Sequence, residues 1–383
     1  MAEMAYFLEA LSPFHLGLRG VGVEATTEHC PSDTLFSALC HAILAQSGAA
    51  ELKRFLDSYP ANEPALVLSS AFPFAPRRRA EEAQWQRPDV LNRDNTVRFY
   101  PRPLELPPSI GNAQGSVKEL KRITWVSEGI FRAWVEGDSL AGHHDKENVA
   151  QGGRIWLAQE ERKSVAGWRD IESDALRLWS KGDSPRVTVD RITSSSQVYQ
   201  AGRVWFQPGG GLWLLMRWRA DWRQQGELAL RILGDEGIGG ERSAGHGQFR
   251  LHGPYELDSL PSPIPGKRFL TLSLYYPKPG ELKDALQGDD VHYQFSVRRG
   301  WMSSPNMRKS VTTGQIASGS GLRRKSVHMF AEGSLLYWPS KGGVLGSLAD
   351  VTPGEFPAPH PVFRYGLAFP VGYRCQAKEA DHG

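Results

Sequence analysis

The sequence predicts an α+β fold made of two related halves, each with a strand–helix–strand rhythm. The chain opens with a half-buried strand over residues 5–11, followed by a capped helix that starts at residue 32. Near the middle, a strand over 211–219 leads into a helix over 225–235. The remainder contains several short strand candidates, and its 12 tryptophans and 26 prolines fit strands and ordered loops better than a helical bundle.

The opening helix is predicted from "PSDTLFSALCHAILAQSG", residues 31–48. Ser32 or Asp33 can cap its start, apolar residues recur on one face, and Gly48 lies just past its expected end. A strand, a loop and a capped helix in this order suit the start of a ferredoxin-like βαββαβ unit.

Two stretches of the first half lack a sustained period and are predicted to be insertions, at about 71–120 and 136–155. The first mixes prolines, aromatics and arginines, and the second is polar and flanked by glycines. We therefore expect an N-terminal domain over 1–180 with these insertions, and a second domain over 181–383.

The second half is rich in predicted strands. A hydroxyl-rich turn separates two of them, and a short helix over 279–286 interrupts the later ones. The strands are expected at 185–191, 202–206, 211–219, 268–277, 293–301, 324–330 and 333–338.

Composition limits the possible classes of protein. The chain has 383 residues and a formal charge of only +3, so partners must be inferred from local patches. Cys30, Cys40 and Cys375 form no ligand spacing, which fits a reducing cytoplasm. No signal peptide opens the chain, and no apolar run approaches the roughly 20 residues that span a bilayer. A cytoplasmic protein without membrane contact is expected.

A glycine-rich loop follows the helix over 225–235. In "GIGGERSAGHGQF", residues 237–249, successive glycines let backbone N–H groups converge into an anion-binding concavity. Arg242 adds a forked donor and Ser243 a hydroxyl. No Gly-Lys-Ser/Thr follows and the loop succeeds a helix, which excludes a P-loop and a dinucleotide fingerprint. A tight turn between helix and strand is equally compatible with the spacing.

Two further segments are suited to a polyanion. Residues 185–206 place arginines around a hydroxyl cluster, and Tyr199 is available to stack a base. Residues 298–325 carry seven cationic side chains and no carboxylate, with Trp301 among them. A serine-rich hairpin turn and a solvated basic loop remain alternative interpretations of these two segments.

Catalytic chemistry has little support. His143, His144 and Asp145 are adjacent but lack an outlying ligand, so no metal site and no cofactor are expected. No G-x-S-x-G motif occurs. A metal-free ribonuclease would need a general base, for which three histidines are candidates: His15, His41 and His246.

The loop resembles the glycine-rich loop of the RAMP superfamily of CRISPR proteins, whose pattern is roughly G-x-G-G-x-R-S-x-G-x-G-x-F. More narrowly, "SPFHLG", "PSDTLFSAL", "PRVTVDRITSSSQVY" and "RRGW…RKSVHMFAEGSLL" resemble, in order, blocks of subunit four of the type III-A (Csm) effector complex. The two predicted insertions contain no matching motif.

The resemblance implies a RAMP fold, with two ferredoxin-like (RRM-like) domains in tandem, a glycine-rich loop and inserted loops or a hairpin. It also implies a non-catalytic subunit of an antiviral ribonucleoprotein that binds the 5′ handle of the crRNA, near the target RNA. Its implied protein partners are the large polymerase-nuclease subunit and an adjacent backbone RAMP subunit. A protruding hairpin in this family wedges between guide and target, and residues 71–105, with Phe72, Phe74 and Tyr100, are the candidate for it.

Together, the motifs and the basic run give the expected RNA-binding residues: His15, Ser32, Asp33, Arg191, Thr193, Ser194, Ser195, Ser196, Tyr199, Gly239, Gly240, Arg242, Ser243, Gly245, His246, Gly247, Arg299, Arg308 and Lys309. Two alternatives stay open. One is a metal-independent crRNA-processing endoribonuclease of the same fold. The other is an interaction module whose basic loops bind an acidic protein.

Overall fold

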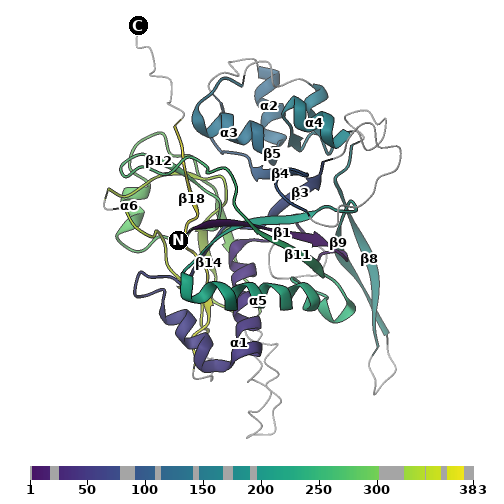
Figure 1. Ribbon diagram of the computed structural model, residues 1–383, viewed down its shortest axis with the longest axis vertical. Coiled ribbons are helices and arrows are strands. Elements are labelled where there is room, and N and C mark those ends of the chain that lie inside the picture. Colours follow the sequence, from purple (N-terminus) through teal and green to yellow (C-terminus); the bar gives the residue numbers. More distant parts are fainter. Residues whose placement is uncertain are drawn as a thin grey trace, which may run out of the picture.

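The computed structural model describes residues 2–17, 26–77, 91–107, 114–140, 146–166, 176–189, 196–301, 323–340, 342–354 and 360–374. It is a mixed α+β structure built around one large sheet (Figure 1). The sheet order is β11-β1-β10-β3-β4-β5-β7-β6, and β2 also pairs with β10. The predicted α+β class is therefore confirmed.

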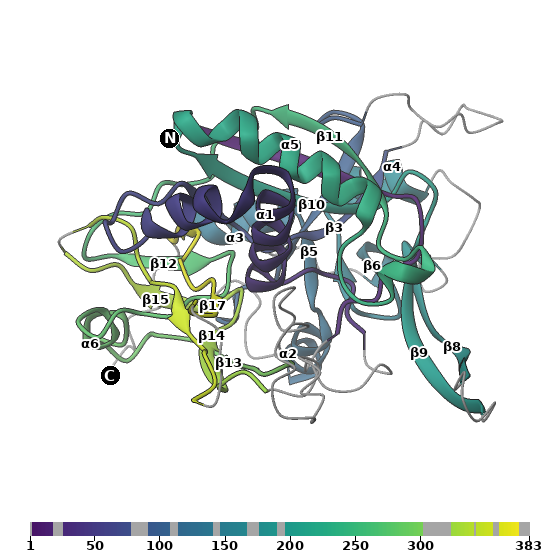
Figure 2. The same cartoon turned by 90° about the horizontal axis from the view of Figure 1, so that it is seen from below.

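Five strands of the large sheet and two helices follow the order of a βαββαβ unit, in which β2 and β3 both pair with β10. Neighbouring strands in β11-β1-β10-β3 all run antiparallel. Figures 1 and 2 show the two helices side by side on one face of the sheet. The elements are β1 (Glu3–Ala10), α1 (Ser32–Asp57), β2 (Leu66–Leu68), β3 (Phe72–Pro76), β10 (Gly211–Trp218), α5 (Ala220–Glu236) and β11 (Phe249–Tyr255).

Residues between β3 and β10 extend the sheet and carry further helices. Strands on both sides of the expected domain boundary at 180 share this sheet, because β1 lies between β10 and β11. The elements of this stretch are β4 (Thr96–Pro101), α2 (Gln114–Arg122), β5 (Trp125–Ser127), α3 (Glu128–Glu136), a 3₁₀ turn (Lys146–Asn148), β6 (Val149–Ala150), β7 (Ile155–Trp156), α4 (Gln159–Ala166), β8 (Trp179–Val189) and β9 (Ser196–Phe206).

The C-terminal part forms small sheets beside the large one. β15-β12-β18 is three-stranded, and β13-β14 and β16-β17 are pairs. The elements are β12 (Arg268–Thr271), α6 (Glu281–Ala285), β13 (Phe295–Arg298), β14 (Val327–Phe330), β15 (Leu335–Tyr337), β16 (Ala349–Asp350), β17 (Phe363–Arg364) and β18 (Pro370–Gly372). Hydrogen bonds attach this part to the βαββαβ unit, among them one from Ser70 N to Leu272 O at 2.8 Å and one from Leu68 N to the Tyr365 hydroxyl at 2.9 Å.

Helix α1 begins where the sequence predicts but continues past Gly48. This glycine adopts φ 83°, which breaks the helical direction, and the helix resumes and ends at Asp57. By length and composition alone α1 could cross a membrane, with a mean hydropathy of 1.2 over its most apolar window. One face of α1, with Leu35, Leu39 and Ile43, is buried in the core.

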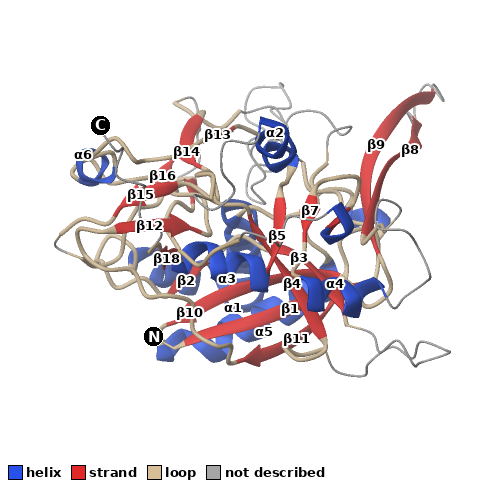
Figure 3. Ribbon diagram, turned by 90° about the horizontal axis from the view of Figure 1, so that it is seen from above, coloured by secondary structure: helices blue, strands red, loops and turns tan. Residues whose placement is uncertain are grey.

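The three aromatic residues of the candidate for the protruding hairpin, residues 71–105, do not reach the surface. Phe72, Phe74 and Tyr100 are at most 1% exposed, because β3 and β4 are strands of the large sheet with both faces covered. The long two-stranded ribbon β8–β9 projects from the body instead, as all three views show (Figures 1, 2 and 3). Residues 78–90 of the predicted insertion lie outside the described residues.

Packing of α5 against the sheet depends on Gly226. A Cβ at this position would overlap with the indole of Trp218, which is 4% exposed. We predict that Gly226→Ala lowers the free energy of unfolding by about 1–3 kcal/mol through overpacking, although alanine favours a helix by about 1 kcal/mol. Urea denaturation measures this change. Leu228→Ala removes a half-exposed side chain of the same helix and is the control; a larger loss there would contradict the prediction.

Candidate nucleic-acid interface

The glycine loop connects α5 to β11 and has an irregular backbone. Gly239 has φ 92° and Gly245 has φ 77°, and between them Arg242–Ala244 form a single 3₁₀ turn. Glu241 also adopts a left-handed conformation, with φ 58°. These dihedral angles explain why glycine recurs in this stretch.

The loop packs on the N-terminal segment 12–17. Gly240 N donates to His15 O at 2.9 Å, and Gly247 N donates to Pro13 O at 2.9 Å. A Cβ at Gly239 would overlap with the carbonyl oxygen of His15, whereas a Cβ at Gly245 would meet nothing within 4 Å. The chain's own packing therefore requires Gly239, and Gly245 faces open space.

The base of the β8–β9 ribbon completes the same region. Phe14 and Val204 exchange backbone hydrogen bonds of 2.9 Å, and His15 Nδ1 lies 2.7 Å from Gly202 O, to which it donates. Tyr199 Oη lies 3.5 Å from the carboxylate of Glu241 in the glycine loop. Three segments that are distant in the sequence thus meet around His15.

His246 is 6% exposed and is held by an arginine of the ribbon. The Arg186 guanidinium donates to His246 Nε2 at 2.8 Å, so this nitrogen must be unprotonated. Burial, together with the positive charges of Arg203 and Arg186, lowers the pKa of His246 below its usual 6.5. The imidazole is therefore neutral at pH 7 and orients Arg186.

The arginines of this region keep donor capacity that contacts within the protein do not use. The Nε atoms of Arg186 and Arg203 are buried and make no hydrogen bond. The side chain of Arg242 is 44% exposed, and its nearest carboxylate, that of Glu236, lies 3.9 Å away. Ser243 beside it is exposed. We call Arg186, Arg203, Arg242 and Ser243 the loop–ribbon cluster, and its chemistry suits an anionic ligand.

The other predicted site residues fall in three groups. Ser32 and Asp33 are buried and bonded within the protein: Ser32 Oγ accepts from Leu274 N at 3.1 Å, and Asp33 pairs with arginines. Their side chains do not reach the surface. Ser196 lies on β9 and Arg299 follows β13, and both are exposed. Those outside the described residues are Arg191, Thr193, Ser194, Ser195, Arg308 and Lys309.

Sequence reasoning did not include Arg186 and Arg203 among the site residues. Both were visible as charged neighbours of the hydroxyl cluster, but their proximity to the glycine loop depends on ribbon register, in which Arg186 pairs with Tyr199. Among the described residues no group of histidine, cysteine and carboxylate side chains could hold a metal ion. His143, His144 and Asp145 lie outside that part of the chain.

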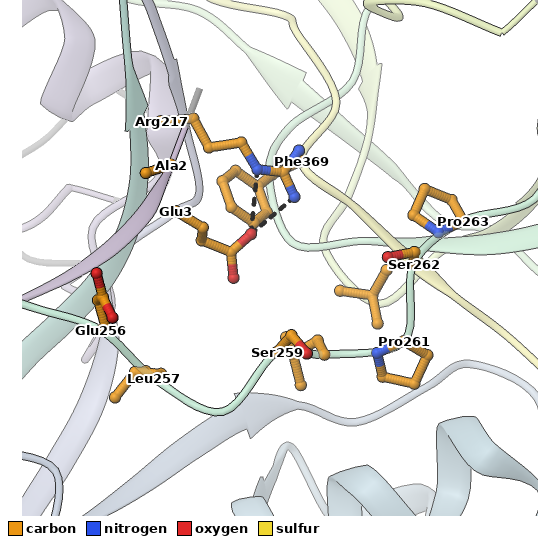
Figure 4. Close-up of a pocket in the computed structure, with 12 residues that line it drawn as sticks. Ala2, Glu3, Arg217, Glu256, Leu257, Ser259, Pro261, Ser262, Pro263 and Phe369 are labelled. Carbon is orange, nitrogen blue, oxygen red and sulfur yellow. Dashed lines mark hydrogen bonds and ion pairs between the residues drawn. The ribbon is translucent and has the colours of Figure 1, made fainter. Parts of the chain in front are cut away.

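A separate cavity of about 320 Å³ lies at the start of β1 (Figure 4). Arg217 donates to Glu3 at 2.7 Å there and covers the ring of Phe369 at 4.3 Å. These charges are already paired, and no residue of the loop–ribbon cluster lines the cavity. It is therefore distinct from the candidate interface.

Comparison with known proteins identifies solved structures that share the fold of this chain. The chain has the fold of subunits solved in type III-A CRISPR assemblies. A crystal structure of a Csm3–Csm4 subcomplex aligns with a TM-score of 0.59 over 97% of this chain and 99% of that chain, at 14% identity. A Csm1–Csm4 cassette in complex with cA4 aligns with a TM-score of 0.52 over 98% and 99%, at 18% identity.

Within this class, the chain resembles Csm4. The family model of the CRISPR Csm4 C-terminal domain matches residues 265–373. Csm4 of Mycobacterium tuberculosis (strain H37Rv) is 26% identical over 344 residues, which are 90% of each chain. Csm4 of Thermococcus onnurineus (strain NA1) is 24% identical over 355 residues, 89% of this chain and 90% of its own. The resemblance predicted from the sequence motifs is confirmed.

Proposed function

We propose that this protein is the non-catalytic, crRNA-binding subunit of a type III-A CRISPR effector complex, and that its loop–ribbon cluster binds the repeat-derived 5′ handle. The observation that carries this proposal is the convergence of the glycine loop, segment 12–17 and the ribbon base around arginines, two of which have a buried Nε that makes no hydrogen bond. Guanidinium and hydroxyl donors are the usual ligands of RNA phosphates.

The ribbon β8–β9 is then the protruding hairpin expected for this family. Val187 and Val198 pair across it and are 57% and 63% exposed, an unusual position for valines without a partner. Apolar side chains at the end of a projecting ribbon suit insertion between stacked bases. We propose that the ribbon wedges between guide and target RNA.

A non-catalytic role fits the state of the histidines. His15 is bonded to Gly202 O and His246 to Arg186, so each ring has a positioning contact within the protein. A processing endoribonuclease would need one of them as general base. Replacing His15, His41 and His246 singly by alanine distinguishes the two: a scaffold keeps the 5′ ends of its bound RNA, and an endonuclease loses them.

The proposal extends to partners and location. The solved relatives contain Csm4 with Csm3 and with Csm1, which supports docking of this chain onto a backbone subunit and onto the large polymerase-nuclease subunit. Such a complex assembles in the cytoplasm. We also propose two ferredoxin-like units, the first being the βαββαβ unit that contains the glycine loop and the second the C-terminal part.

Arg242 provides the direct test of the loop. We predict that Arg242→Ala weakens binding of a handle RNA by about 1–3 kcal/mol, because a charge-assisted hydrogen bond is lost. Fluorescence anisotropy at one fixed salt concentration measures the change. Arg231→Ala removes the same charge from the exposed side of α5 and is the control. Equal affinity of the two variants would contradict the loop as a phosphate site.

The whole assignment is tested by co-expression with the neighbouring CRISPR subunits and a repeat–spacer array. The protein is captured and the 5′ ends of the bound RNA are sequenced. A single repeat-derived 5′ end, with the large subunit in the same capture, is the expected result. Heterogeneous ends, or capture without RNA, would overturn the proposed function.

A further inference from the structure

Three arginines surround one buried aspartate at the start of α1. Asp33 accepts from Arg298 at 2.8 and 2.9 Å and from Arg364 at 2.5 Å. Arg324 is the third arginine, half-buried beside them, where the backbone N of Arg324 donates to Gly300 O at 2.9 Å. The cluster therefore carries more positive than negative charge.

Arg324 has no carboxylate of its own in the described part of the chain. Its Nε is buried without a hydrogen-bond partner. Burial and the charges of Arg364 and Arg298 lower its pKa from 12.5 to about 10, and Asp33, already shared by two guanidiniums, is the one acid that opposes them. Residues 302–322, which precede it in the sequence, contain neither Asp nor Glu. A partly buried guanidinium without a carboxylate of its own favours the binding of an anionic ligand.

The surface between this cluster and the glycine loop is one face of α1. This face consists of Thr34, Ser37, Ala38 and His41, which recur at helical spacing and are all partly exposed. The first three have small side chains. His41 ends this face: burial first, then the positive charges of Arg242 and Arg324, lower its pKa. At the other end of this face, Arg298 donates to Thr34 Oγ1 at 3.1 Å, so the arginine cluster contacts α1 there directly.

We propose that Arg324, backed by Arg298 and Arg364, binds a second phosphodiester of the RNA held at the glycine loop, after the strand crosses the α1 face between Thr34 and His41. This inference rests on the proposed function, and within the basic run 298–325 it assigns a specific phosphate contact to Arg324. Small side chains on α1 leave room for the sugar–phosphate backbone, and the surplus guanidinium supplies the counter-charge.

The crossing would connect two parts of the fold. Asp33 belongs to the βαββαβ unit, whereas Arg298, Arg324 and Arg364 belong to the C-terminal part. A strand that contacts both Arg242 and Arg324 spans this junction. Bound RNA would then stabilise the arrangement of the two parts as well as occupy a site.

The test compares Arg324→Gln with Arg323→Gln in the full chain. Arg323 is the matched control, because it carries the same charge one residue away but is exposed over the ring of Trp301 at 4.7 Å. We expect Arg324→Gln to weaken handle-RNA binding about tenfold and Arg323→Gln about twofold or less. The unfolding temperature of free Arg324→Gln should be unchanged or higher, since repulsion among guanidiniums is relieved.

A methylphosphonate scan of the handle RNA identifies the phosphate involved. Neutralising one phosphate at a time should reveal one position that abolishes the effect of Arg324→Gln and a different position that abolishes the effect of Arg242→Ala. Equal losses for Arg324→Gln and Arg323→Gln, or a single shared position, would overturn the second site while the proposed function stands. If Arg242→Ala also has no effect, the proposed function fails with it.

Discussion

Asp33→Ala is expected to lower the free energy of unfolding by about 3–5 kcal/mol, because it removes the carboxylate that pairs with the buried guanidiniums of Arg298 and Arg364. Asp33 is 2% exposed, and the two guanidiniums come from β13 and β17, which the sequence separates widely from α1. Guanidinium chloride denaturation at pH 7 measures the loss. The variant should also detach the C-terminal part from the first unit.

An exposed ion pair provides the control for this substitution. Asp57 pairs with Lys53 on α1 at 2.5 Å, and their side chains are 61% and 75% exposed. Asp57→Ala should cost no more than about 0.5 kcal/mol, since solvent screens such pairs. A loss below about 1 kcal/mol for Asp33→Ala would show that the buried arginines find other partners, and would contradict the structure at this junction.

The same ion pair sets an acid limit on stability. Burial by itself raises the pKa of Asp33, but Arg298 and Arg364 outweigh it and lower the pKa from 3.8 to about 2. The carboxylate therefore stabilises the fold fully above pH 3.8, and this contribution is lost as the pH falls toward 2. Asp33→Ala should remove this part of the loss of stability at low pH. The part due to Glu28, whose pKa is also lowered to about 2, should remain.

Gly239→Ala is expected to detach the glycine loop from segment 12–17. A Cβ there overlaps with His15 O, which also accepts the hydrogen bond from Gly240 N, and φ 92° is itself unfavourable for alanine. We expect a loss of about 2–4 kcal/mol in stability, from strain and steric overlap together. Because the loop carries Arg242, affinity for handle RNA should fall at least as far as in Arg242→Ala.

Gly245 separates backbone strain from steric overlap. It also has a positive φ, of 77°, but a Cβ there meets no atom within 4 Å. Gly245→Ala should therefore cost only about 1–2 kcal/mol and leave the loop in place. Thermal unfolding and RNA anisotropy of both variants provide the measurement. Equal effects of the two substitutions would mean that the contact with His15 does not hold the loop.

Local patterns predicted much of the fold. The strand at 5–11 corresponds to β1, the helix at 225–235 lies within α5, and the glycine loop follows α5 as expected. The sheet partners were not predictable, because pairing of β1 with β10 and β11 is non-local. Residues 72–76 were assigned to an insertion because the stretch 71–120 has no sustained period, yet β3 lies inside the sheet.

The sequence predicted the glycine loop of the candidate site but not the contacts that other elements make with it. Arg242 and Ser243 were recognisable from the glycine pattern and are exposed. Ser32 and Asp33 have the polarity of surface residues, and only the structure reveals that they are buried against Leu274 and against arginines. The contact between Arg186 and His246 joins residues from separate elements, which no local period encodes.

Insertion of the long segment between β3 and β10 has a consequence for how the protein is made. β1 is complete at Ala10, but both of its sheet neighbours lie beyond Gly211. At a translation speed of about 5–20 residues per second, roughly ten to forty seconds pass before β10 leaves the ribosome. During that interval both edges of β1, with the apolar side chains of Phe7 and Leu8, have no partner strand. We therefore expect the nascent chain to be prone to association through this strand until β10 has been synthesised.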